Sequence, residues 1–436
     1  MKIYQKLVPI LLVVLMAVSA YQLISDKVAM QSEYNGYLKE AEAYYKEGIV
    51  VDAVAALEKA YDMNPSIKLL LKEGEYFQSV GYMSDSIRIA EELLETYPKE
   101  TETYDYALNC YMMFDRFEEC YAVLDTAEKR NIKSDTTKKI TEELKYKYDL
   151  TGRSFEKIGG YNAKCYTVFR RDYWGYCNQK GQVVIDCVYK NAGPFVNYVA
   201  PVTDVDGNTY FIDTEGNKKL NIPSKLKCEK AGALISDTVV LVCNGKYGYY
   251  DGKFNYKFGS YDYASAMYNS AAAIKEGNSW YLIDSSGKKI NKTPYADIKI
   301  NEIEIANMSD IFFVKSGEKY IMVDSKGKQI GKSQFDDAKC FSDGEIAAVK
   351  IEGKWGFVDP KGKIVIEPQY EEARSFSNEL AAVKKDGKWG YIDKDNKIVI
   401  ECKFDDCNDF NNGGFAFVKE PGDEKYSTLT LYSKNH

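Results

Sequence analysis

The chain contains 436 residues, carries a net charge of −7, and is 45% hydrophobic and 28% charged. Its length suffices for two hydrophobic cores, and its acidic balance disfavours nucleic acid, which binds to clustered positive charge. The only histidine is His436, so catalysis through a histidine base and histidine-ligated metal sites are nearly excluded. We expect neither a cofactor nor a bound metal.

Residues 1–30 are predicted to be a signal anchor or a signal peptide. An apolar run of eighteen residues extends from Leu7 to Ile24, and Lys2 and Lys6 precede it. This length lies at the lower limit for a membrane span, and Val18-Ser19-Ala20 offers a cleavage site, which would give a secreted protein. The run continues beyond that site, which favours a single-pass membrane protein with its domains outside the cell membrane.

Residues 31–150 carry a helical repeat. Small and aromatic residues recur after 33 and then 34 residues, at the spacing of a two-helix unit. The three copies are Tyr37, Ala41, Tyr44, Ala53, Leu57 and Ala60; Leu70, Gly74, Phe77, Ser86, Ala90 and Leu93; and Tyr104, Leu108, Tyr111, Cys120, Leu124 and Ala127. This pattern resembles the tetratricopeptide repeat family and predicts an α-helical solenoid of three units, closed by a helix over about residues 135–149.

The resemblance implies a peptide-binding groove lined by the first helix of each pair. The implied groove residues are Asn35, Leu38, Glu42, Tyr45, Lys68, Leu71, Glu75, Gln78, Asp105, Asn109 and Met112. Residues 31–150 contain 15 Lys and Arg against 25 Asp and Glu, so we expect a neutral or basic protein or peptide partner. Two alternatives stay open: the groove packs against the rest of the chain, or the charge is only a solvated surface.

Residues 151–436 carry a second repeat, marked by a turn-forming Asp or Asn. The seven markers are Asn178, Asp213, Asp251, Asp284, Asp324, Asp359 and Asp393, spaced 35, 38, 33, 40, 35 and 34 residues apart. Each copy predicts three short strands joined by tight turns, as at Asp359-Pro360-Lys361-Gly362. The array is expected to begin near residue 155, and an eighth copy begins at Phe404 and ends without its last strand.

One bulky aromatic position recurs ahead of the turn in these copies. It is occupied by Trp174, Tyr247, Trp280, Tyr320, Trp355 and Trp389. A tryptophan in such a position could stack on a ligand, but replacement by tyrosine in two copies favours structural anchors that pack one sheet on the next.

These residues resemble the WG-repeat family of bacterial proteins. The family unit is a Trp-Gly-aromatic-aliphatic-Asp core, a glycine-containing turn, an aliphatic triplet and a Tyr-x-x-Ala segment, as over residues 335–410 and 155–195. The resemblance implies a β-repeat architecture with an extracytoplasmic or interaction role and no catalytic residues. Repeated small sheets predict a β-propeller of seven or eight blades, with an open stack of hairpins as the alternative.

Acidic pairs recur at Asp336-Asp337, Glu371-Glu372 and Asp405-Asp406. Two carboxylates suit glycoside hydrolysis, but a recurring repeat position indicates a structural role, so we expect no enzyme. The predicted function is a membrane-tethered interaction scaffold of the bacterial cell envelope, which binds one partner through the helical repeats and a second through the β-repeats. The alternative is a binder of cell-wall glycan, whose candidate stacking residues are Tyr166, Tyr173, Tyr198 and Tyr268.

Overall fold

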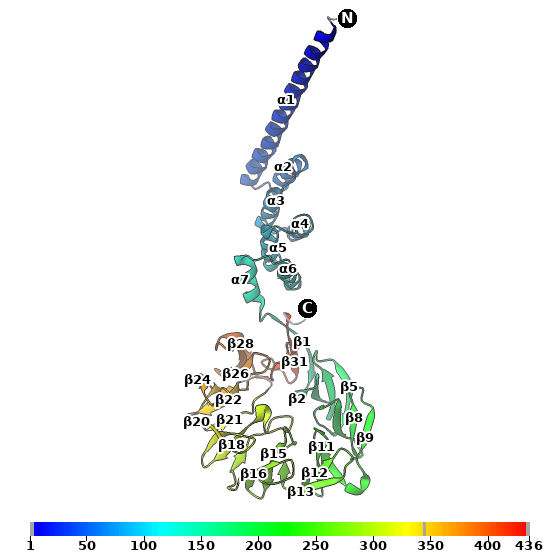
Figure 1. The fold of residues 1–436 in the computed structure, drawn as a ribbon, viewed down its shortest axis with the longest axis vertical. Coiled ribbons are helices and arrows are strands. Elements are labelled where there is room, and N and C mark those ends of the chain that lie inside the picture. The colour runs from blue at the N-terminus through cyan, green and yellow to red at the C-terminus, as the bar shows by residue number, and fades with distance from the viewer. Residues whose placement is uncertain (1–3, 343–345, 433–436) are drawn as a thin grey trace. The chain divides into compact units, whose positions relative to one another are not determined.

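A computed structural model describes residues 4–342 and 346–432, with only the backbone described for residues 4–14 and Arg153. The chain divides between Lys145 and Tyr146 into two compact units. The first unit is helical, and the second consists of short antiparallel sheets (Figure 1).

Seven helices form the described part of the first unit. They are α1 (Tyr4–Lys46), α2 (Val50–Met63), α3 (Ile67–Ser79), α4 (Met83–Thr96), α5 (Thr101–Met113), α6 (Phe117–Lys129) and α7 (Asp135–Leu144). The predicted pairs correspond to the end of α1 with α2, α3 with α4, and α5 with α6, and α7 is the final helix. Small side chains permit close packing: a Cβ on Gly74 of α3 would lie 2.2 Å from the Tyr106 hydroxyl of α5.

Helix α1 extends across the boundary predicted at residue 30 between the N-terminal segment and the helical repeats. It continues from the N-terminal apolar run into the first predicted repeat. Within the part of the chain that the structure describes, no helix has the length and apolar character needed to cross a membrane. The predicted span over residues 7–24 lies partly outside the residues whose side chains are described, and the membrane anchor stays a prediction.

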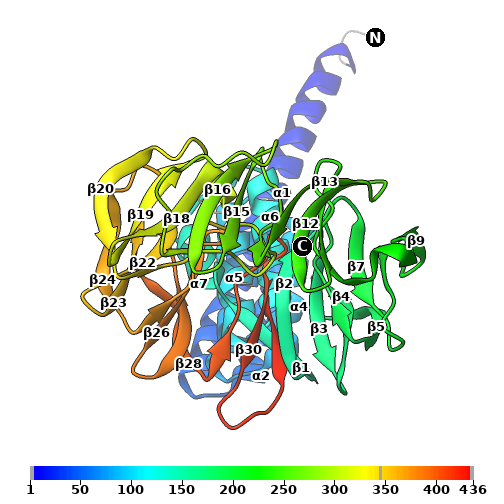
Figure 2. The same cartoon turned by 90° about the horizontal axis from the view of Figure 1, so that it is seen from below.

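Eight sheets follow one another around a ring and form an eight-bladed β-propeller (Figures 1 and 2). Blade 1 is β2 (Lys157–Asn162), β3 (Cys165–Arg170), β4 (Tyr173–Asn178) and β5 (Val183–Tyr189); blade 2 is β6 (Asn191–Ala192), β7 (Val199–Thr203), β8 (Thr209–Asp213) and β9 (Lys218–Asn221); blade 3 is β10 (Cys228–Ala231), β11 (Thr238–Cys243), β12 (Lys246–Asp251) and β13 (Tyr256–Tyr261); blade 4 is β14 (Tyr263–Ala264), β15 (Ala271–Glu276) and β16 (Ser279–Asp284).

The remaining blades follow in the same order. Blade 5 is β17 (Asp297–Ile298), β18 (Ile311–Ser316), β19 (Lys319–Asp324) and β20 (Gln329–Phe335); blade 6 is β21 (Asp337–Ala338), β22 (Ala347–Ile351), β23 (Lys354–Val358) and β24 (Ile364–Tyr370); blade 7 is β25 (Glu372–Ala373), β26 (Ala381–Lys385), β27 (Lys388–Ile392) and β28 (Ile398–Phe404); blade 8 is β29 (Asp406–Cys407), β30 (Phe415–Lys419), β31 (Tyr426–Leu431) and β1 (Tyr148–Phe155). Two short 3-10 helices, η1 (Ser224–Leu226) and η2 (Met308–Asp310), lie between strands.

Blade 8 closes the ring with strands from two distant parts of the chain. Strand β1 pairs with β31, and Leu150 stands opposite Leu429. The last strand that the eighth sequence copy lacks is therefore supplied from before the first copy, and the open stack is wrong. Strand β1 also crosses residue 150, the boundary predicted between the helical and β-repeat domains.

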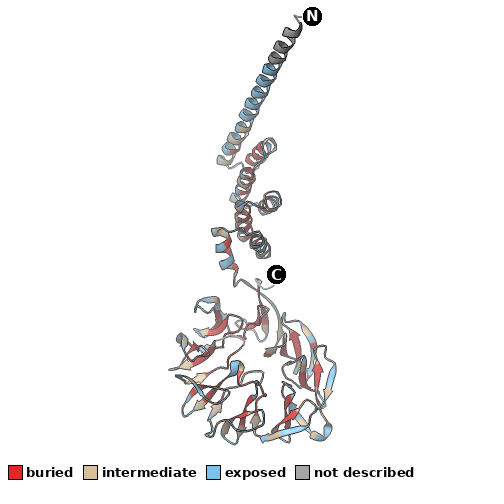
Figure 3. Ribbon diagram, in the orientation of Figure 1, coloured by how far each residue is buried: buried red, intermediate tan, exposed pale blue. Residues whose placement is uncertain are grey.

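In blades 6 and 7, side-chain and backbone packing explains why tryptophan is followed by glycine. Trp355 and Trp389 are buried, and the strand that follows each pair bulges toward the glycine. A Cβ on Gly356 or on Gly390 would lie 2.5 Å from the carbonyl oxygen of that strand. Buried residues run along the middle of every blade (Figure 3), because alternate side chains of a strand point to opposite faces and both faces meet a neighbouring sheet.

Each turn marker accepts hydrogen bonds from the backbone of its own turn. The Asp359 carboxylate accepts from the Lys361 N–H at 2.9 Å and from the Lys363 N–H at 2.8 Å. Asn178 makes the same two contacts, with Lys180 and Gln182. The aspartates therefore recur because a short side-chain acceptor holds this turn.

Candidate functional site

The predicted groove residues lie on the first helix of each pair, and we call them the first-helix surface. Asn35, Leu38, Glu42 and Tyr45 lie on α1; Lys68, Leu71, Glu75 and Gln78 on α3; and Asp105, Asn109 and Met112 on α5. Each is exposed or half-buried. How far each residue is available to bind a partner protein depends on the contacts that it makes within the helical unit.

Two of these residues join the first and second repeats. The Lys72 ammonium lies 3.0 Å from the Glu42 carboxylate, and this hydrogen bond lowers the pKa of Glu42. The Tyr45 ring stacks on Tyr76 with centroids 3.8 Å apart. Glu42 and Tyr45 therefore connect α1 to α3, although Glu42 is exposed, as Asn35 and Glu75 are.

The third repeat uses Asp105 to hold α7. The Ser134 hydroxyl donates to the Asp105 carboxylate at 2.5 Å and accepts from the Thr137 N–H at 3.0 Å. Ser134 is the N-cap of α7, so the carboxylate also lies at the favourable end of that helix dipole. Asn109 stays exposed on the same face of α5.

A cavity of about 280 Å³ in the helical unit lies away from the first-helix surface. It is lined by Leu94 of α4, Tyr111 of α5, Glu119, Ala122, Val123 and Thr126 of α6, and Arg130 after α6. The repeat pattern does not indicate this cavity, because its walls join the second helices α4 and α6 to Tyr111 of the first helix α5.

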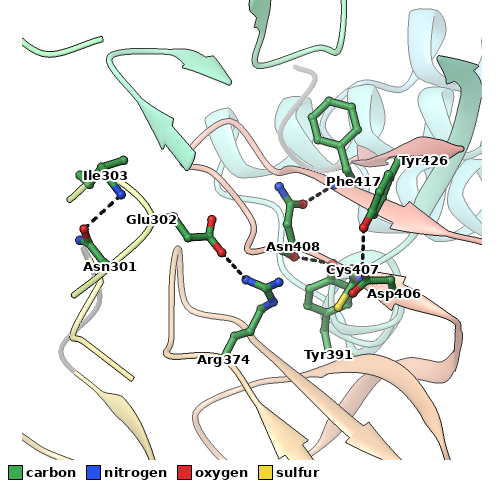
Figure 4. Close-up of polar contacts among 10 residues, drawn as sticks. All are labelled: Asn301, Glu302, Ile303, Arg374, Tyr391, Asp406, Cys407, Asn408, Phe417 and Tyr426. Atoms are coloured by element: carbon green, nitrogen blue, oxygen red, sulfur yellow. Dashed lines mark hydrogen bonds and ion pairs between the residues drawn. The ribbon is translucent and has the colours of Figure 1, made fainter. Parts of the chain in front are cut away.

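A long loop spans the centre of the propeller. This central loop, residues 299–310, connects β17 with β18, whereas the corresponding loop of blade 7 covers residues 374–380. Its Glu302 lies 3.0 Å from the Arg374 guanidinium of blade 7 (Figure 4), and its Glu304 lies 2.5 Å from the Lys230 ammonium of blade 3. Its Ile303 would lie 2.7 Å from a Cβ on Gly160 of blade 1.

The loop is held by charge and by its own backbone. Asn301 accepts hydrogen bonds from the backbone of Ile303 and Ile305, and the Ala266 N–H of blade 4 donates to the Glu304 carbonyl at 2.8 Å. Burial opposes the charge of Arg374, but the neighbouring carboxylates outweigh it and raise its pKa. The Arg374 guanidinium is thus charged at neutral pH.

A cavity of about 200 Å³ lies beside the central loop. Blades 1, 2 and 3 and the loop contribute Trp174, Asn191, Ala192, Gly193, Pro194, Pro201, Val202, Thr203, Thr209, Lys230, Ala231, Glu302 and Glu304 to its lining. Its walls combine an indole ring, ion-paired charges and hydroxyl groups, which suits a small polar group.

The aromatic repeat positions are not equivalent. Tyr320, Trp355 and Trp389 are buried in the blades. Trp174, Tyr247 and Trp280 are half-buried, and Trp174 also reaches the cavity wall.

The recurring acidic pairs make contacts within and between blades. Asp336 pairs with Lys319 and Asp405 with Lys388, and Glu371 accepts from the Gly387 N–H at 3.0 Å. Their neighbours do the same: Asp337 pairs with Lys299, Glu372 with Lys384, and Asp406 with Tyr426 (Figure 4). These contacts give each carboxylate a structural role.

The four tyrosines considered for glycan stacking differ in exposure. Tyr166 is 1% exposed and donates to the Phe415 carbonyl, so it is not available to a glycan. Tyr198 is 75% exposed and Tyr173 is 38% exposed, and Tyr268 is half-buried.

The family model described as WG containing repeat matches residues 174–207, 322–355, 355–389 and 389–426. No curated protein matches the chain. Similar solved structures include BamB from Moraxella catarrhalis, with 13% identity over 66% of this chain and 94% of that chain and a TM-score of 0.40. They also include the Arabidopsis OM64 TPR domain, with 14% identity over 27% of this chain and 97% of that domain and a TM-score of 0.23. The C-terminal unit is therefore an eight-bladed propeller that contains WG repeats.

Proposed function

We propose that this protein is a non-catalytic interaction scaffold of the bacterial cell envelope, tethered to the membrane by its N-terminal segment. The observation that carries the proposal is a helical repeat with an accessible first-helix surface in the same chain as a closed β-propeller. Both architectures present large surfaces to partners.

The partner of the first-helix surface is a neutral or basic peptide. Residues 31–150 hold 25 acidic against 15 basic residues, and Glu75 is exposed at the middle of the surface. Asn35 and Asn109 supply amides that can bind a peptide backbone.

Site-specific photo-crosslinking in intact cells tests this assignment. A photoreactive residue at Leu71 or Asn109 should capture one defined protein, and the same residue at Val51 of α2, which is 62% exposed, should not. Glu75→Lys should weaken capture from Leu71 several-fold by repelling a basic partner, whereas Glu128→Lys on α6 should leave it unchanged. Equal capture from Val51 would contradict the assignment.

Fractionation tests the tether. The full chain should stay with membranes after alkaline washing, and a chain that begins at residue 31 should be released. Recovery of a shortened chain outside the membranes would instead support secretion after cleavage.

Glycan binding is a second candidate function, and the exposure of Tyr198 and Tyr173 favours it, because exposed aromatic rings stack on sugar faces. Tyr198→Ala should reduce retention on isolated cell wall, whereas Tyr256→Ala, at a ring that is 61% exposed on β13, should not. Unchanged retention in the Tyr198 variant would exclude this ring.

A further inference from the structure

Two cysteines of blade 3 stand directly opposite one another. Cys228 is the first residue of β10 and Cys243 is the last residue of β11, and their backbones are in register. All ten cysteines are free thiols. Among the strand pairs that the structure describes, no other two cysteines are paired in this way.

Antiparallel register places these two residues at the separation that a disulfide requires. Directly opposed residues have Cα atoms about 4.5–5.5 Å apart, and disulfides span Cα distances of about 4.4–6.8 Å. The Cα separation typical of directly opposed residues therefore lies within the range that a disulfide spans. The register shift between Cys228 and Lys230 adds local freedom to the β10 end, because a bulge interrupts the ladder.

Neither cysteine is fully enclosed, and both pack at the edge of a core cluster of blade 3. Each cysteine is half-buried. The Cys228 thiol lies 3.1 Å from the Lys230 carbonyl oxygen, and the Tyr250 hydroxyl lies 3.8 Å from the Cys243 sulfur. Burial and the neighbouring Cys243 raise the pKa of the Cys228 thiol to about 12, so oxidation should speed up as the pH rises, because the thiolate is the nucleophile.

We propose that Cys228 and Cys243 form an intramolecular disulfide when the protein meets a low-molecular-weight disulfide. One thiolate attacks the reagent, forms a mixed disulfide and expels one thiolate of the reagent. The second cysteine then attacks the protein sulfur of that mixed disulfide and expels the other. The two cysteine thiols lose two protons and two electrons in total, and the reagent is reduced to two thiols.

This bond would fix the edge of the propeller cavity. Strand β10 carries Lys230, whose ammonium pairs with Glu304 of the central loop, and both residues line the cavity. The bond would tie that strand to β11 and hold Lys230 in place, so oxidation would stiffen this part of the cavity wall.

Peptide mapping of the full-length protein tests the proposal. The protein is incubated with oxidised glutathione, quenched in acid, alkylated and digested. We expect a linked Cys228–Cys243 peptide, about 2 Da lighter than its two reduced parts, and loss of alkylation at both residues. Full alkylation of both residues, or their linkage to other cysteines, would overturn the proposal.

Two variants complete the test. Cys228→Ser should abolish the linked peptide and leave Cys243 as a mixed disulfide with glutathione. Cys402→Ser, which removes another half-buried thiol, should leave the Cys228–Cys243 peptide at its wild-type yield. The wild-type map alone decides whether the bond forms, so the test holds even where a variant fails to fold.

Discussion

At the scale of single residues, the WG repeat depends on close backbone approach. The glycine after each buried tryptophan faces a bulge in the next strand, and any side chain there meets a carbonyl oxygen. The tryptophan side chain fills the interior of the blade, and the glycine beside it leaves room for the backbone of the next strand.

Gly356→Ala should lower the free energy of unfolding of the propeller by about 1–3 kcal/mol, because the added methyl group overpacks β23 against β24. Urea unfolding followed by tryptophan fluorescence measures the change. Lys354 on the same strand is exposed, so Lys354→Ala should change the free energy of unfolding by less than about 0.5 kcal/mol. Equal effects of the two substitutions would show that the close approach is not limiting.

Asp359→Ala should destabilise blade 6 by about 1–2 kcal/mol, because two backbone N–H groups lose their acceptor. Asp359→Asn keeps the acceptor, as Asn178 does in blade 1, and should retain most of the stability. The same urea titration compares the three proteins. An asparagine variant as weak as the alanine variant would indicate that charge, and not hydrogen bonding, holds the turn.

At the scale of elements, a buried charge joins α3 to α4. Glu73 is 4% exposed, and its carboxylate lies 2.8 Å from the Arg88 guanidinium. Burial raises the Glu73 pKa, and Arg88 opposes this without cancelling it. The folded unit therefore binds this proton more tightly than the unfolded chain does.

Loss of the Glu73 proton should make the helical unit less stable as the pH rises. Because the pKa of Glu73 is raised in the folded protein, protonated Glu73 contributes its full stabilisation below the unfolded pKa of about 4.3. This stabilisation is lost as the pH rises through the folded pKa. Glu73→Gln cannot titrate and should flatten the pH dependence of the urea midpoint, whereas Glu75→Gln, which is exposed on the same helix, should not. Identical slopes for wild type and Glu73→Gln would refute this assignment.

At the scale of the whole molecule, the propeller depends on a strand that precedes its first blade. Strand β1 completes blade 8 by pairing with β31, and Tyr148 and Leu150 pack on the core that contains Trp389 and Leu429. Closure removes the open sheet edge that would otherwise recruit another chain.

A chain that begins at residue 146 should therefore fold as a monomeric propeller, and one that begins at residue 156 should unfold at lower urea and self-associate. The second chain keeps every full sequence copy but exposes the β31 edge. Size-exclusion chromatography and urea unfolding compare the two. A monomeric chain of unchanged midpoint from residue 156 would mean that blade 8 is stable with three strands.

The repeats, their phase and the turns can be predicted from the amino-acid sequence, because they depend on residues close together in the chain. The Trp-Gly pairs, the turn aspartates and the small helix positions all carry local signals, and the helical pairs and the short repeated strands follow from them. The longest spacing, the 40 residues between Asp284 and Asp324, contains the central loop, but the spacing alone does not show where that loop goes.

The contacts between distant segments could not be predicted from the sequence and are seen only in the folded protein. The pairing of β1 with β31, the position of Glu302 and Glu304 across the ring, and the use of Asp105 to hold α7 join residues that no local pattern relates. Likewise, Tyr166 and Tyr198 have the same aromatic character in the sequence, but the fold buries one and exposes the other. Burial and ring closure are properties of the packed molecule, since they depend on which surfaces come together when the chain is folded.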